Sequence, residues 1–269
     1  MSAQNYLGLI QWILAEIQSH ETKAIKAAAK LMAAAIRKKG RVYMFGSGHS
    51  VIPVLDIFPR YGSFVGFFPL YDPRLMWSNV IGPGGARELL WLERQEGYAK
   101  VFLQSYPLEK RDVMLVFSHG GLNAAPIEMA LEARARGLKV VTVSSHANAK
   151  IGKRSHSSGR VLSETADVAI DNHVPPEDAL VDVGQLERVA AGSTVAAVAI
   201  AMSLVAETAA ELARTGQVPP TFVSPNVRGV PPGHMAGVYQ AFTEFYYARP
   251  FKAVPKAAKK TAGKTGKGK

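Results

Sequence analysis

Apolar residues near the N-terminus recur at the three- and four-residue spacing of amphipathic helices. They form two groups: Leu7, Ile10, Leu14 and Ile17, and then Ile25, Leu31, Met32 and Ile36. Polar residues 19–21 separate the groups. This spacing predicts two helices, within about residues 1–39, before the first strand.

From residue 41 onward, short apolar runs typical of buried strands alternate with segments of helical pattern. The predicted strands are residues 41–45, 64–68, 113–117, 139–144 and a short one at 167–171. One predicted helix begins near residue 50, and two others span residues 86–105 and 124–136. Because the strands are apolar on both faces, the pattern predicts an α/β fold with a doubly wound, five-stranded parallel sheet between helical layers.

Two loops rich in Gly and Ser follow the first and third predicted strands, at residues 46–50 and 118–123. In the strand order 2-1-3-4-5, these loops open into one crevice. Each precedes a helix, so free backbone N–H groups meet a helix N-terminus there, and Ser47, Ser50 and Ser118 add hydroxyl donors. The loops together predict a site for a small phosphorylated anion, although each loop alone also fits a tight strand-to-helix turn.

Composition supports one domain over residues 1–250, because 269 residues with 48% hydrophobic content suffice for a sizeable core. The net charge of +11 is concentrated at the C-terminus. Residues 251–269 hold seven Lys and no acid, which leaves +4 for the rest. We expect this tail to be disordered. Two interpretations of the tail stay open. It makes a weak contact with nucleic acid or an anionic surface, or it is a solvated segment with no dedicated partner.

The sequence gives no sign of secretion or of a membrane span. The N-terminus lacks the basic start of a signal peptide, and the absence of Cys excludes disulfides and thiolate chemistry. Residues 189–206 carry no charge, but their Gly, Ser, Thr and Ala content favours a fully buried helix or a subunit interface over a span. We therefore expect a soluble, cytoplasmic protein.

Several well-known site types do not fit the sequence. In the first loop, Val51 stands where a dinucleotide fingerprint needs its third Gly. No P-loop, His-Glu-x-x-His or Gly-x-Ser-x-Gly motif is present. Metal-ligand spacing is also lacking. The sequence thus predicts neither a cofactor nor a metal.

Acid–base chemistry has three candidate residues. Glu93 and Glu96 are expected to share one face of the predicted helix 86–105, where like charge and partial burial raise a carboxyl pKa. The alternative is an exposed face on which nearby Arg residues pair with them. His156 follows the fourth strand and either reaches the crevice as an acid or base or is a solvated loop residue.

These residues resemble the SIS (sugar isomerase) domain, whose signature is Gly-x-Gly-x-Ser after strand 1 and Ser-x-Ser-Gly-x-Thr/Asn after strand 3. The resemblance is to its UPF0309 group over roughly residues 5–230. It is carried by residues 93–99, 123–133, 156–160, 171–179 and 192–194. It implies a flavodoxin-like α/β/α sandwich and a homodimer or homotetramer with sites near subunit interfaces.

The resemblance also implies roles for individual residues. Ser50, Ser118 and Asn123 match phosphate-binding positions, and Glu93 or Glu96 falls where the fold often keeps a base. The full set of candidate ligand-binding residues is Gly46, Ser47, Gly48, His49, Ser50, Ser118, His119, Gly120, Asn123, Ser144, Ser145, Ser193 and Thr194. Gly120 departs from the family pattern because it replaces the second serine. A phosphate donor is lost there unless a protonated His119 compensates.

The first functional hypothesis is a phosphosugar isomerase in which Glu93 or Glu96 moves a proton through an enediol while His156 or His49 assists ring opening or polarises the carbonyl. A lyase or etherase would use the same carboxylate. A third hypothesis is a non-catalytic sugar-phosphate sensor. Only about 40 residues precede the sheet, too few for the helix-turn-helix domain of SIS transcription regulators.

Overall fold

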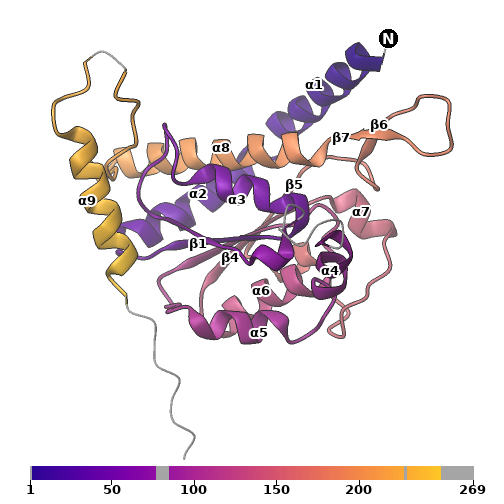
Figure 1. The fold of residues 1–269 in the computed structure, drawn as a ribbon, viewed down its shortest axis with the longest axis horizontal. Helices are drawn as coiled ribbons and strands as arrows, with labels where there is room; N and C mark the ends of the chain where they lie inside the picture. The colour runs from indigo at the N-terminus through magenta and orange to yellow at the C-terminus, as the bar shows by residue number, and fades with distance from the viewer. Residues whose placement is uncertain (1, 77–84, 227–228, 250–269) are drawn as a thin grey trace, which may run out of the picture.

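The computed structural model describes residues 2–76, 85–226 and 229–249, and shows a parallel sheet with helices on both faces (Figure 1). The sheet strands are β1 (Val42–Gly46), β2 (Phe67–Leu70), β3 (Val113–Phe117), β4 (Lys139–Ser144) and β5 (Val168–Asp171). Their order is β2-β1-β3-β4-β5, and all pairs are parallel. The predicted fold class and strand order are therefore confirmed.

Helices cover both faces of this sheet. The helices are α1 (Ser2–His20), α2 (Thr22–Arg37), α3 (Val51–Ile57), α4 (Gly85–Leu92), α5 (Tyr98–Phe102), α6 (Ala124–Ala135), α7 (His146–Ile151), α8 (Ser193–Ala213) and α9 (His234–Tyr247). Short 3₁₀ helices are η1 (Gly48–Ser50), η2 (Pro73–Leu75), η4 (Leu103–Ser105) and η5 (Leu162–Thr165). A separate antiparallel hairpin joins β6 (Ala179–Val181) to β7 (Val189–Ala191).

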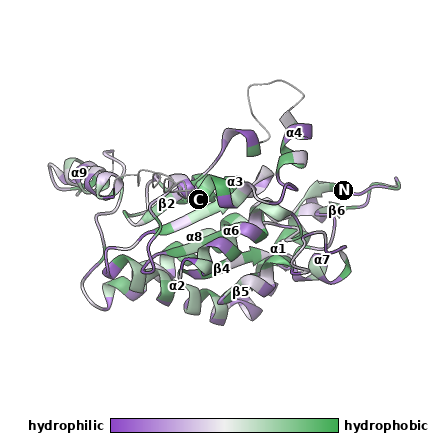
Figure 2. Ribbon diagram, turned by 90° about the horizontal axis from the view of Figure 1, so that it is seen from below, coloured by the Kyte–Doolittle hydropathy of each residue, from purple (hydrophilic) through white to green (hydrophobic). Residues whose placement is uncertain are grey.

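The core has two halves because successive side chains of a strand point to opposite faces. On β1, Val42 and Met44 join a cluster with α1, α2, α3 and α8, whereas Tyr43 and Phe45 join one with α4, α5 and α6. All five β1 residues are buried. In Figure 2, α8 and the strands near it are coloured mainly as hydrophobic.

Two predicted elements have different bounds. The predicted helix 86–105 is broken between α4 and α5 at Gly97, whose φ of +92° is left-handed and suits glycine. Glu93 and Glu96 therefore lie in a turn and do not share a helical face, so that prediction is wrong. The second strand lies at 67–70 rather than 64–68, because Phe64 instead forms an isolated antiparallel bridge with Thr221.

The uncharged segment 189–206 divides into β7 and most of α8. Among the described residues, α8 is the one helix long and apolar enough to cross a membrane by length and composition. One side of it packs on α2 and α3, as the sequence predicts for a core helix, but Val195, Ser203 and Ala206 on the other side are exposed. It is not buried all round. The Lys-rich tail, residues 251–269, lies outside the described residues.

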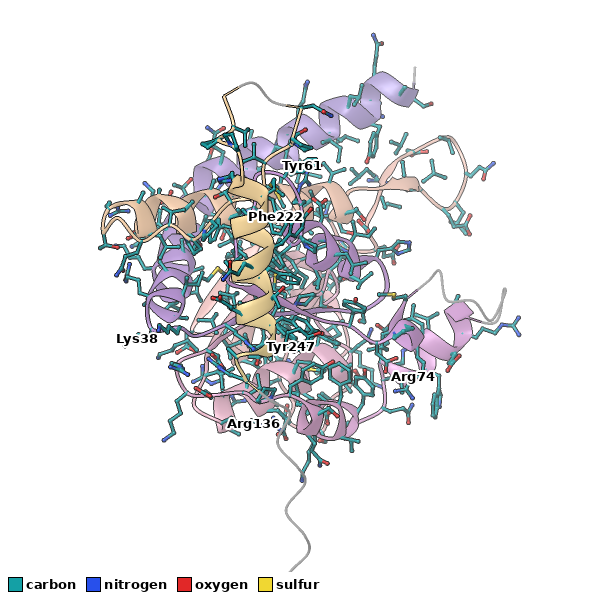
Figure 3. The ribbon with its side chains drawn as sticks, turned by 60° about the vertical axis from the view of Figure 1, so that its left-hand side comes forward. Lys38, Tyr61, Arg74, Arg136, Phe222 and Tyr247 are labelled. Atoms are coloured by element: carbon teal, nitrogen blue, oxygen red, sulfur yellow. The ribbon has the colours of Figure 1, made fainter. Side chains whose placement is uncertain are left out.

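Helix α9 covers the β2 edge of the sheet, and Figure 3 shows it running between the labelled Phe222 and Tyr247. Its Tyr246 ring stacks on Phe68 of β2 at 5.3 Å. The buried Arg41 guanidinium donates to the backbone carbonyls of Phe245 (2.7 Å) and Tyr246. The C-terminal helical segment is thus fixed to the amino end of the sheet.

Candidate functional site

The loop after β1 is a tight turn that only glycine permits at its start. A Cβ on Gly46 would lie 2.0 Å from the backbone oxygen of Ser50, and Gly48 has a φ of +58°. The N–H of Ser50 donates to the carbonyl of Ser47 at 3.1 Å. This turn brings Ser47, His49 and Ser50 to the carboxyl end of the strand.

The loop after β3 comes from the neighbouring strand and meets the first loop, as the strand order predicts. The hydroxyl of Ser118 accepts from the N–H of Gly121 at 3.2 Å, and Gly121 has a φ of +65°. Asn123 occupies the N-cap position of α6 without capping it. Its side-chain amide is instead available to a neighbouring segment.

Glu93 connects the two loops. One carboxylate oxygen accepts from the Ser47 hydroxyl at 2.8 Å, and the other accepts from the Asn123 amide at 2.7 Å. The residue is only 7% exposed. Burial raises the pKa of Glu93, opposed by the Ser47 hydrogen bond and the charge of Arg94. A buried carboxyl with a raised pKa can both accept and return a proton near neutral pH.

A small polar pocket lies beside these loops, between the sheet and the N-terminus of α8. Its polar lining consists of His49, Ser50, Ser118, His119, Asn172, Ser193 and Thr194. Six of these seven residues are among the candidates from the sequence, drawn from three separate segments of the chain. The structure thus brings together most of the predicted phosphate-binding side chains.

The α8 side of the pocket carries a negative charge. One oxygen of Asp178 accepts from the backbone N–H of Ser193 at 2.7 Å, and the other accepts from the Ser193 hydroxyl at 2.6 Å. The same carboxylate accepts from the N–H of Gly192. Both donors of Ser193, the first residue of α8, are therefore already occupied, so we expect the loops after β1 and β3 to supply most contacts to an anion.

His119 is a half-buried side chain whose surroundings favour the neutral imidazole. Burial lowers the pKa of His119, opposed by the carboxylates of Asp178 and Asp171. Its Nδ1 lies 3.3 Å from the Asn172 amide nitrogen, and its Nε2 has no hydrogen-bond partner among the described residues. When Nδ1 accepts from Asn172, Nε2 carries the proton. His119 is then a neutral donor in the pocket wall, and not the protonated side chain that was considered from the sequence as compensation for Gly120.

Other predicted site residues lie elsewhere. The Ser145 hydroxyl caps α7 and donates to the carbonyl of Val174 at 2.6 Å, and Ser144 is buried beneath the loops without lining the pocket. Glu96 is separated from the partners of Glu93, and two hydrogen bonds from Ser157 lower its pKa. His156 lies near Glu96, so the structure does not place either residue with Glu93.

Sequence reasoning missed three residues of this region. Asn172 and Asp178 follow β5, where no Gly/Ser motif marks the chain, and Glu128 lies on α6. Asn172 contacts His119, and Asp178 caps α8. Segments 123–133 and 171–179 carried the family resemblance, and that was the available signal.

The chain has clear relatives. The SIS domain family matches residues 5–145. The UPF0309 protein of Halalkalibacterium halodurans is 34% identical over 85% of this chain and 93% of its own length. The UPF0309 protein of Oceanobacillus iheyensis is 36% identical over 79% of this chain and 85% of its own length. The UPF0309 protein of Streptomyces coelicolor is 34% identical over 81% of this chain and 86% of its own length.

Two solved structures share the fold at low sequence identity. A phosphoheptose isomerase from Francisella tularensis has a TM-score of 0.51 and 16% identity, covering 77% of this chain and 95% of its own. The phosphoheptose isomerase GmhA from Neisseria gonorrhoeae also has a TM-score of 0.51, with 14% identity and coverages of 77% and 96%. The solved structures show the fold, and the family model together with the UPF0309 relatives shows that the chain belongs to the UPF0309 group of SIS-domain proteins.

Proposed function

We propose that this protein binds a phosphorylated sugar at the loops after β1 and β3 and interconverts its aldose and ketose forms with Glu93 as the base. The observation that carries the proposal is the position of Glu93, whose buried carboxyl is held by Ser47 of one loop and Asn123 of the other. The SIS family and the phosphoheptose isomerases of the same fold support the substrate class.

In the proposed binding mode the phosphate occupies the polar pocket. The hydroxyls of Ser50, Ser118 and Thr194 and the Nε2–H of His119 supply neutral donors. Neutral donors can bind a dianion without any buried cation, because each hydrogen bond to a charged oxygen is stronger than a neutral pair. The sugar carbons then extend from the pocket toward Glu93.

In the proposed mechanism, Glu93 ionises and removes the proton from the carbon next to the carbonyl, giving an enediolate, the anion of the enediol. The same carboxyl returns the proton to the adjacent carbon, while the hydroxyl and carbonyl oxygens exchange one proton. The raised pKa of Glu93 assists the abstraction step, because the protonated carboxyl that this step produces is formed at low cost in a buried environment. Glu96 and His156 have no reacting role in this proposal.

A binding-only sensor is the second candidate, and Gly120 favours it. This residue provides no hydroxyl where the family pattern has its second serine, and the Asp178 carboxylate faces the donors of α8. Both features weaken the phosphate site. The two functions differ in turnover, since a sensor binds the sugar phosphate and leaves it unchanged.

The proposal also includes a homodimer or homotetramer. Leu7 and Trp12 on α1 are 59% and 53% exposed, and the outer side of α8 is open as well. Multi-angle light scattering of the purified protein tests this part, since a monomer at micromolar concentration would contradict it.

Thermal unfolding with a ligand panel tests the proposed binding site. The panel contains aldose, ketose and amino-sugar phosphates beside their unphosphorylated forms, and a ligand at 100 times its Kd adds about 2.7 kcal/mol of stability. Ser50→Ala and Ser118→Ala should remove most of the shift. Ser203→Ala, the same change on the exposed side of α8, should retain it. If no phosphorylated sugar shifts the wild-type protein, the proposal fails.

A further inference from the structure

Three potential metal ligands from distant segments converge outside the proposed sugar site. Glu96 lies in the turn between α4 and α5, Glu128 on α6, and His156 in the loop after α7. The Nε2 atom of His156 is 3.8 Å from a carboxylate oxygen of Glu128 and 4.0 Å from one of Glu96. All three ligand atoms lie within 4.8 Å of one another.

The His156 ring is buried and has a free nitrogen that faces the two carboxylates. Its side chain is 6% exposed, and Nε2 has no hydrogen-bond partner among the described residues. Nδ1 accepts from the backbone N–H of Ser158 at 3.1 Å and lies 2.7 Å from the Ser158 hydroxyl oxygen. In this tautomer the proton on Nε2 has no acceptor in range. In the other tautomer Nδ1 donates to the hydroxyl, and the lone pair of Nε2 faces the carboxylates, as a metal ion requires.

The two carboxylates are already oriented by the backbone around them. Glu128 accepts from the N–H of Gly97 at 2.6 Å and from that of Ala99 at 3.2 Å. Glu96 accepts from the N–H of Ser157 at 2.6 Å. Hydrogen bonds of this kind fix ligand groups in metal sites. Each carboxylate oxygen retains a further lone pair for a ligand.

We propose that Glu96, Glu128 and His156 bind one divalent transition-metal cation of the zinc type. A hydrogen bond does not span 3.8 to 4.0 Å, whereas two metal–ligand bonds of about 2.1 Å can. One imidazole with two carboxylates suits zinc, iron(II) or manganese better than magnesium or calcium, which prefer oxygen ligands alone.

The proposed site is open on one side. The Glu96 side chain is 41% exposed, whereas that of Glu128 is 14% exposed, so the ion enters past Glu96 and water completes its coordination. A bound cation joins the turn at 93–97 to α6 and to the loop around His156. Because Glu93 lies in that turn, the cation braces the segment that carries the proposed base.

Titration of the chelator-treated full-length protein with Zn²⁺ against a chromophoric competitor tests this site without any sugar. Wild type should bind one ion, and Glu96→Gln and His156→Gln should each weaken binding at least 10-fold. Glu96→Gln is the cleaner variant because its side chain is exposed and its loss leaves the Glu128 hydrogen bonds intact. X-ray absorption of the loaded protein should show one imidazole among oxygen ligands.

Two controls separate this site from adventitious binding. Glu132→Gln changes the acid one turn further along α6, and His20→Gln changes the surface His20–His173 pair, whose ring centroids are 5.5 Å apart. Both should bind Zn²⁺ as wild type does. The proposal is overturned if wild type binds no stoichiometric ion, if Glu96→Gln and His156→Gln bind as tightly as wild type, or if His20→Gln removes the binding.

Discussion

The two ends of strands β1 and β3 have opposite kinds of polar chemistry. At the amino ends, Asp112 accepts from the N–H groups of Arg41 and Glu109 and from the guanidinium of Arg249 at 2.7 Å, so its buried carboxylate is fully paired. At the carboxyl ends, Nε2 of His119, which follows β3, and the hydroxyl of Ser144, at the end of the neighbouring β4, have no partner among the described residues. Buried polar groups are normally satisfied.

The difference separates stability from function. The paired charges at the amino ends fix α9 to the sheet and leave no donor for a ligand. The carboxyl ends keep donors unused and a carboxyl with a raised pKa, a cost that folded proteins accept mainly where a ligand binds. Variants at the two ends should therefore change different measurements.

The largest expected effect is on turnover, from Glu93→Gln. The substitution should lower kcat 10²- to 10⁴-fold, about 3–5 kcal/mol of barrier, because the base is lost. Binding should persist, since Gln can accept from the Asn123 amide while its own amide donates to the Ser47 hydroxyl. Turnover of the sugar phosphate found by thermal unfolding is the measurement. Glu88→Gln on α4 is the matched control.

If Glu93→Gln turns over as wild type does, the proposed role of Glu93 is wrong. A wild-type protein that binds the sugar phosphate and never converts it supports the sensor instead. Neither result bears on the paired charges at the amino ends of the strands, which are tested by stability.

The next largest effect is on stability, from Asp112→Asn at the amino ends. The change removes one of the two carboxylates that pair with the buried Arg249 side chain, and Glu109 remains 3.4 Å from it, so we expect a loss of about 2 kcal/mol in the free energy of unfolding. Asp56→Asn breaks an exposed pair with Arg60 and should cost less than 1 kcal/mol. Urea unfolding measures both. An Asp112→Asn protein that remains as stable as wild type would contradict the comparison.

Much of this architecture could be predicted from the sequence because it depends on local pattern. Strands apolar on both faces predicted the parallel sheet, and the Gly/Ser loops indicated the crevice at their carboxyl ends. The break was missed because apolar residues continue at helical spacing through 86–105, whereas the folded chain leaves the helix after Leu92 and turns through a left-handed φ at Gly97.

The remaining parts of the site depend on packing between distant segments. Glu96, Glu128 and His156 are separated by 32 and 28 positions, so no ligand spacing marks them, and the absence of a local metal motif carried little information. The role of Asp178 likewise depends on where α8 begins. Burial distinguishes Glu93 from Glu96, and burial is a property of the folded chain.

A smaller effect is expected on the pH dependence of stability, from His119. Burial lowers the pKa of His119 from its ordinary 6.5, so below that pH the unfolded chain binds a proton that the folded chain does not. This contribution to stability is complete above pH 6.5 and is lost as the pH falls through the lowered pKa, at up to about 1.4 kcal/mol per pH unit. His119→Gln should flatten the profile of urea unfolding between pH 5 and pH 7. His49→Gln, in the other loop, serves for comparison.

An unchanged slope in His119→Gln would show that another group titrates in this range. It would also remove the argument that His119 is a neutral donor at the carboxyl ends.

The smallest expected effect is a gain of affinity from Gly120→Ser. Its φ lies outside the left-handed region, and an added Cβ would meet only the side chain of Asn148 at an ordinary 3.5 Å. The serine should therefore fold as well as wild type, with stability within about 0.5 kcal/mol. Its hydroxyl restores a donor beside Ser118 and should tighten phosphate binding by about 1 kcal/mol, roughly 5-fold in Kd.

Calorimetric titration of Gly120→Ser with the sugar phosphate and with its unphosphorylated form identifies where such a gain arises. The gain should be confined to the phosphorylated ligand, and Gly237→Ser, which adds a hydroxyl in open space on α9, should give none. A Kd that stays unchanged would mean that Gly120 does not weaken this site. The donors of Ser50, Ser118, Thr194 and His119 would then suffice for the phosphate, and the case for a sensor would lose its main support.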